Sequence, residues 1–99
     1  MSDTGWISIA ANGAEVLFKT DRGWIDVAIK GTSADDVQLQ KNYDSLDAAT
    51  PDPDGWETVE TLNAPKIGLP VFEPRSDDTW WRLYVPVYTA GTLLGRISR

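Results

Sequence analysis

The chain offers carboxylates for chemistry but lacks the two side chains that most often carry nucleophilic or metal chemistry. It contains neither His nor Cys in its 99 residues. Their absence excludes Ser-His and Cys-His catalysis, cysteine zinc clusters and disulfides. Carboxylates alone can still hydrolyse glycosides or bind calcium, so the acidic residues are the remaining candidates for chemistry.

The acidic residues do not form a recognisable site. Five could offer oxygen ligands to calcium, namely Asp44, Asp47, Asp52, Asp54 and Glu57. Their spacing does not match a twelve-residue calcium loop, so a Pro-Asp-Gly turn in a solvated loop is the favoured interpretation. The pairs Asp35-Asp36 and Asp77-Asp78 could act as acid and base on a sugar, but turn capping explains both. We therefore expect no catalytic residue, no cofactor and no metal.

The segment 79–88 reads as a strand with two unusual faces. Successive side chains of a strand point to opposite faces. One face is an apolar row suited to a core, made of Trp81, Leu83, Val85 and Val87. The other combines aromatic rings with a guanidinium, in Trp80, Arg82, Tyr84, Pro86 and Tyr88. Such residues are enriched where proteins bind other surfaces, so we expect a partner interface formed by Trp80, Arg82, Tyr84 and Tyr88, with Trp24 as a further member.

Proline within this segment suggests where the strand lies. Pro86 has no amide hydrogen, which predicts an edge or a bulge of the longest strand, with a partner subunit covering that edge. For Trp80, two roles stay open: contact with a partner, or packing beneath a neighbouring loop. Arg82 could stack on the flanking rings and pair with another chain, or form a local surface ion pair. Trp56 and Trp81 are expected in the core.

Turn residues recur at nearly even spacing along the whole chain, and the runs between them are short. This pattern is typical of an antiparallel sandwich. The strand candidates are 6–10, 15–19, 24–30, 37–43, 56–62, 66–72, 79–88 and 92–97. No window has a convincing helical period, since 45–49 is short and leads into Pro51. We expect one all-β domain over residues 1–99, an antiparallel β-sandwich that is immunoglobulin-like or jelly-roll-like.

Local patterns add detail to the sandwich. Asn12-Gly13 predicts a tight hairpin between 6–10 and 15–19. In 24–30, Ile25, Val27 and Ile29 should face one side and the intervening residues the other. Trp56 and Val59 have opposite parity, so either a bulge separates them or one faces out. The acidic stretch 44–55 should be a flexible loop that projects from a hairpin.

Charge and termini limit the possible partners and location. The net charge is -6, which disfavours binding to a phosphate backbone. No run approaches the length of a membrane span, and the start lacks a basic segment followed by an apolar one. We therefore expect assembly in the cytoplasm, with no nucleic acid and no membrane as partner.

Several segments from Val37 onward resemble small all-β virion proteins of tailed bacteriophages. The similar segments are Val37-Gln38-Leu39-Gln40, Asp54-Gly55-Trp56-Glu57-Thr58-Val59, Arg82-Leu83-Tyr84-Val85 and Tyr88-Thr89-Ala90-Gly91-Thr92-Leu93. The resemblance implies a non-enzymatic capsid decoration, cement or head-fibre subunit that binds the major capsid protein, commonly as a homotrimer. A tail-associated structural role is an alternative. A module that binds carbohydrate through Trp24 and Trp80 is the alternative from another class.

Overall fold

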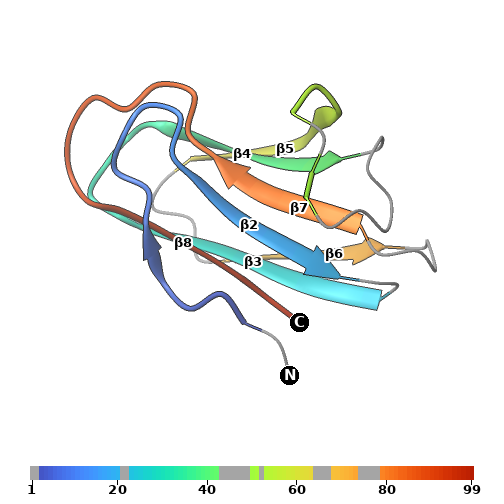
Figure 1. Ribbon diagram of the computed structural model, residues 1–99. Coiled ribbons are helices and arrows are strands. Elements are labelled where there is room, and N and C mark those ends of the chain that lie inside the picture. The colour runs from blue at the N-terminus through green and yellow to red at the C-terminus, as the bar shows by residue number, and fades with distance from the viewer. Residues whose placement is uncertain (1–2, 21–22, 43–49, 52, 64–67, 74–78) are drawn as a thin grey trace.

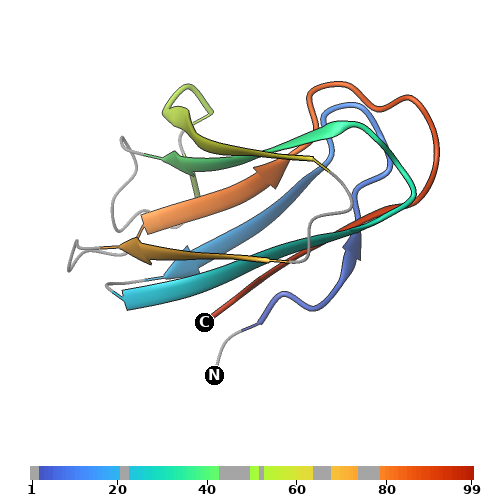
Figure 2. The same cartoon turned by 180° about the vertical axis from the view of Figure 1, so that it is seen from behind.

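The computed structural model describes residues 3–20, 23–42, 50–51, 53–63, 68–73 and 79–99. Within these residues the chain is all-β, as predicted, and has no helix. Two antiparallel four-stranded sheets pack face to face, as Figures 1 and 2 show from opposite sides. The strands are β1 (Ile7–Ser8), β2 (Glu15–Thr20), β3 (Gly23–Gly31), β4 (Asp36–Asn42), β5 (Trp56–Asn63), β6 (Leu69–Glu73), β7 (Thr79–Tyr84) and β8 (Leu93–Ser98).

The order of the strands identifies the type of sandwich. Sheet A has the order β1-β8-β3-β6, and sheet B has the order β2-β7-β4-β5. Every connection passes from one sheet to the other, except the β4–β5 connection within sheet B. This is the order of an eight-stranded jelly roll. Of the two sandwich types that the sequence left open, the structure has the jelly roll.

Period-two alternation produces the core between the sheets. In β3, Ile25, Val27 and Ile29 are buried while Trp24 is exposed, as predicted; Ala28, on the outer side, is also buried. The inward side of β8 includes Gly95. A Cβ at Gly95 would meet Leu83 Cδ1 at 3.0 Å and Ile9 Cδ1 at 3.1 Å, so only glycine lets these side chains approach the strand so closely.

Strand β7 is shorter and more central than the sequence indicated. Trp81, Leu83 and Val85 are buried as predicted, but the prediction for Val87 is wrong, because its side chain is exposed. The strand ends at Tyr84, and Pro86 lies beyond it, where the chain leaves the sheet. The expected edge position is also wrong. Strand β7 pairs with β2 on one side and with β4 on the other, so no partner subunit is needed to cover it.

The predicted hairpin around Asn12-Gly13 is not formed. Gly13 has the expected positive φ of 73°, but β1 pairs with β8 in sheet A and β2 pairs with β7 in sheet B. The turn therefore carries the chain between sheets. A turn signal predicts a reversal of direction, and it does not determine which strands pair afterwards.

The β4–β5 pair has the hairpin relation that the sequence indicated, and of the two alternatives left open for Trp56 and Val59 the structure has a bulge. Leu39 faces Glu60 and the next residue, Gln40, faces Thr58, so Val59 is the extra residue and is exposed. The loop predicted at 44–55 lies mostly outside the described residues.

A carboxylate ties two loops together at one end of the sandwich. Asp35 accepts hydrogen bonds from the Thr89 backbone amide (2.8 Å) and from the Ser33 hydroxyl (2.8 Å). These bonds lower the pKa of Asp35 below its ordinary value of 3.8, the Thr89 amide contributing most. Asp35 thus has the capping role expected of it, and it holds the chain just after β7 against the β3–β4 connection.

An ion pair that the sequence did not suggest is buried between the sheets. Lys41 of β4 pairs with Glu73 of β6, and the two side chains are 9% and 0% exposed. The Lys41 ammonium also lies 5.2 Å from the centroid of the Trp81 ring. Because β4 belongs to sheet B and β6 to sheet A, this pair links the two layers. Charged groups in such a position are costly to bury unless each compensates the other.

We expect single and paired replacements of these two residues to differ sharply. Lys41→Met alone should cost about 3–5 kcal/mol of unfolding free energy, because Glu73 would be left as a buried charge without this cation. The double variant Lys41→Met/Glu73→Leu should recover most of that loss, since neither charge is then buried. Urea unfolding of the three proteins measures both values. A double variant less stable than Lys41→Met would contradict this account of the pair.

Candidate functional site: the outer faces of the two sheets

Three of the five predicted interface residues lie together on the outer face of sheet B. The alternation that buries Trp81 and Leu83 turns Trp80, Arg82 and Tyr84 outward. In register, Arg82 has Leu17 of β2 on one side and Gln40 of β4 on the other. It therefore occupies the middle of this face.

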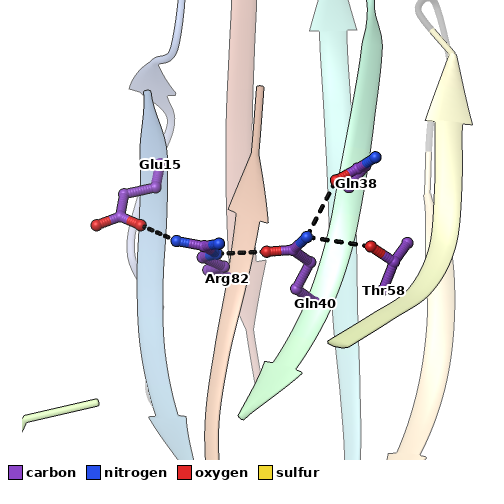
Figure 3. A network of polar contacts seen from close by, with 5 residues as sticks. All are labelled: Glu15, Gln38, Gln40, Thr58 and Arg82. Carbon is purple, nitrogen blue, oxygen red and sulfur yellow. Dashed lines mark hydrogen bonds and ion pairs between the residues drawn. The ribbon is translucent and has the colours of Figure 1, made fainter. Parts of the chain in front are cut away.

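Arg82 is the centre of a polar network that spans all four strands of sheet B (Figure 3). Its Nη1 lies 2.8 Å from Glu15 Oε2 on β2, and its Nε donates to Gln40 Oε1 on β4 at 2.5 Å. Gln40 Nε2 in turn donates to Gln38 Oε1 and to Thr58 Oγ1 on β5, each at 3.0 Å. Since one side chain bonds to the next across the strands, the network fixes the rotamers of this face.

Aromatic rings lie against the same guanidinium. Arg82 Cζ is 4.4 Å from the centroid of Trp56 and 4.2 Å from the centroid of Tyr84. A planar guanidinium can stack on rings while it donates in its own plane, which an ammonium cannot do. The sequence left stacking and a local ion pair as alternatives for Arg82, and the structure contains both within one chain.

The arrangement corrects the expectation for Trp56. Trp56 was expected in the core, but it is half-buried and faces outward, opposite Asn42 in the register. The bulge at Val59 shifts the parity of the first half of β5, so that Trp56 joins the outer face. This face is therefore flat, aromatic and polar, with its central groups already bonded to one another.

The other two predicted interface residues lie elsewhere. Tyr88 follows β7 and is half-buried against the core; its hydroxyl donates to the Gly91 carbonyl and its amide to Asn12 Oδ1. Trp24 lies on the outer face of sheet A, on the opposite side of the sandwich from Arg82. The five residues therefore do not form one surface.

Trp24 belongs to a second aromatic group, which the sequence did not reveal. It faces Phe72 of β6 in the register, and the two ring centroids are 5.2 Å apart with a tilt of 57°. Their exposed fractions are 62% and 43%, so both residues are exposed at the surface. Phe72 follows Pro70 in a short segment whose sequence alternates only weakly between apolar and polar residues. Its position opposite Trp24 is what marks it as part of a surface group, and that position is known only from the fold.

Another tryptophan, Trp6, lies on sheet A's side of the molecule and has two cations over its ring. Lys30 Nζ is 4.2 Å and Arg96 Cζ is 5.0 Å from the centroid of Trp6. The two cations come from β3 and β8, so this group holds the segment before β1 to its sheet.

We expect Arg82 to need its guanidinium rather than its charge. Arg82→Lys should lower the unfolding free energy by about 1–3 kcal/mol, because one ammonium cannot replace the two directed bonds and the two stacked rings. Arg96→Lys on sheet A is the matched control and should cost less than about 1 kcal/mol, since a lysine can also lie over a ring. Urea unfolding at fixed ionic strength measures both, and equal losses would count against the network.

Within the described residues no pocket is present, and no three acidic residues are grouped so that they could hold a metal ion. The described part of the chain also has no helix long and apolar enough to cross a membrane. Comparison with protein-family models, with curated proteins and with solved structures finds no match for this chain.

Proposed function

We propose that the chain is a non-enzymatic structural subunit of a tailed-bacteriophage virion, a decoration or cement protein that binds the assembled shell through the major capsid protein. It assembles in the host cytoplasm, is located on the virion and forms a homo-oligomer there. The sequence resemblance from Val37 onward supports this proposal. The two-layered jelly roll supports it as well, since such sandwiches serve as viral capsid modules, among other functions.

One observation carries the proposal, namely the exposed ring pair Trp24–Phe72. Large rings in solvent are unusual on a monomer and are the residues that dominate binding when they are covered. The pair lies on β3 and β6, next to the free edge of sheet A, where a partner could approach. The rings on the outer face of sheet B are by contrast half-buried: Trp56 and Tyr84 lie against Arg82, and Trp80 lies near Lys19. We therefore place the shell contact on sheet A.

The proposal is tested with empty shells assembled from a major capsid protein encoded in the same genome as this chain. Wild type should co-sediment with the shells, and Trp24→Ala or Phe72→Ala should weaken binding about 30-fold, as expected of a hot spot of about 2 kcal/mol. Trp80→Ala is the matched control on sheet B and should bind as wild type does.

Three outcomes would count against the proposal in different ways. If Trp80→Ala loses binding while Trp24→Ala keeps it, the docking face is on sheet B. If the chain binds purified tails and not shells, the tail-associated role replaces decoration. If the gene has no capsid or portal gene as its neighbour and the protein binds neither particle, the structural role is wrong.

Carbohydrate binding is the second candidate, and the outer face of sheet B favours it. Trp56, Trp80 and Tyr84 offer ring faces, and Gln38 and the Arg82 network offer polar groups between them. Sugars bind to such mixtures of rings and fixed hydrogen-bonding groups. Retention on a polysaccharide column that is lost in Trp80→Ala but kept in Trp24→Ala would support this function over shell binding.

A further inference from the structure

Four strands lie at the edges of the two sheets, and three of them have features that discourage pairing with another chain. Strand β1 is only two residues long. Strand β5 has the bulge at Val59 and carries Glu57 and Glu60. Strand β6 contains Pro70 at its second position. Short length, bulges, charges and proline are the usual means by which proteins keep sheet edges from associating.

The fourth edge strand, β2, is six residues long and has neither a bulge nor a proline; its two charged residues, Glu15 and Lys19, are of opposite sign and lie on its outward side. Its six residues pair one for one with β7, from Glu15 opposite Tyr84 to Thr20 opposite Thr79, without a register shift. Its inward side carries Val16, Phe18 and Thr20, so no charge points inward. On its other side it pairs with no strand of the described chain. A regular edge without proline or bulge is a template for strand addition, and side chains of opposite sign allow a second copy to pair with it.

We propose that β2 pairs with β2 of a second copy of this chain, antiparallel, around a two-fold axis that passes through Leu17. In this register Leu17 faces the partner's Leu17, and Glu15 faces the partner's Lys19. The same pairing repeats at the other end of the strand by symmetry, so two ion pairs flank one apolar contact. A two-fold contact of this type uses the same surface on both subunits.

Several registers would keep the core-facing side chains of both β2 strands on the same face of the joined sheet. The charges of Glu15 and Lys19 favour the register proposed here over the others. A shift by one pair in either direction places Glu15 or Lys19 opposite the partner's Leu17, which would put a charge against an apolar side chain. Directly opposed charges of opposite sign on one face of an antiparallel pair are favourable. The side chain of Glu15 is 37% exposed while it pairs with Arg82, so it remains accessible to a second cation.

Exposed apolar side chains on the same side of the sandwich agree with this contact. Leu17 on β2 is 39% exposed, and so are Trp6 and Ile7 at β1. Strand β2 packs against β8, and β8 is the neighbour of β1, so β1 and β2 are the sheet edges on one side of the molecule. Pairing through β2 would bring this side toward the partner and join both B sheets into one continuous sheet.

This inference does not depend on shell binding, because Trp24 and Phe72 remain uncovered in the dimer. The proposed dimer does differ from the trimer implied by the sequence resemblance, since strand-edge pairing around a two-fold axis is complete with two copies.

Sedimentation equilibrium of the full chain over a wide concentration range tests the proposed dimer. Wild type should follow a monomer–dimer equilibrium, and Leu17→Lys should lower the association constant about tenfold or more, because two cations would meet at the axis. Val59→Lys, on the opposite edge of sheet B, is the matched control and should leave the association constant unchanged.

A crosslink tests the register itself. The chain has no native cysteine, so a disulfide formed by a single-cysteine variant can only join that position in two copies of the chain. Facing residues in an antiparallel pair have Cα atoms roughly 4.5–5.5 Å apart, which a disulfide can span. Leu17→Cys should give a covalent dimer under mild oxidation much faster than Val59→Cys does. Monomeric wild type at all concentrations, a trimer, or equal crosslinking at both positions would overturn the proposal; folding of each variant is checked by its urea midpoint.

Discussion

The alternation of side chains along β7 is the constraint on which the rest of the molecule depends. Trp81, which points inward, is the largest fully buried side chain of the core, and Arg82, its neighbour, holds together the outer face of sheet B. Since β7 is paired on both sides, one strand fixes the position of β2 and of β4 as well. A shift of this strand by one residue would exchange a core ring for a guanidinium and disrupt both layers.

The jelly roll separates three surfaces that have different physical properties. The outer face of sheet B is bonded within itself, from Glu15 through Arg82 to Thr58, and is suited to a rigid role. The outer face of sheet A exposes Trp24 and Phe72, the two rings that a partner could cover. The β2 edge offers backbone pairing. The proposed shell contact and the proposed β2 pairing therefore use separate surfaces of the same fold.

Much of the fold follows from local pattern, because alternation and turn residues are local properties. The sandwich class, the inward side of β3 and the burial of Trp81 could all be predicted in this way, while the parity of Trp56 and Val59 left a bulge and an outward-facing residue as alternatives. Features that depend on which strands become neighbours could not be predicted. The central place of β7, the outward turn of Trp56, the Lys41–Glu73 pair and the Trp24–Phe72 pair each join segments that are distant in sequence. Pro86 led to the wrong prediction of an edge strand, because the sequence does not distinguish a proline that follows a strand from one that lies within an edge strand.

The most direct test of the facing of β7 is a comparison of Trp80→Ala with Trp81→Ala by urea unfolding. The account predicts a loss of about 3–5 kcal/mol for Trp81→Ala, because a fully buried ring is removed and a cavity remains. It predicts less than about 1 kcal/mol for Trp80→Ala, whose ring is half-buried on the outer face and lies 5.9 Å from Lys19 Nζ. A larger loss for Trp80→Ala than for Trp81→Ala would show that the strand faces the other way, and the core and the Arg82 network described above would then be wrong.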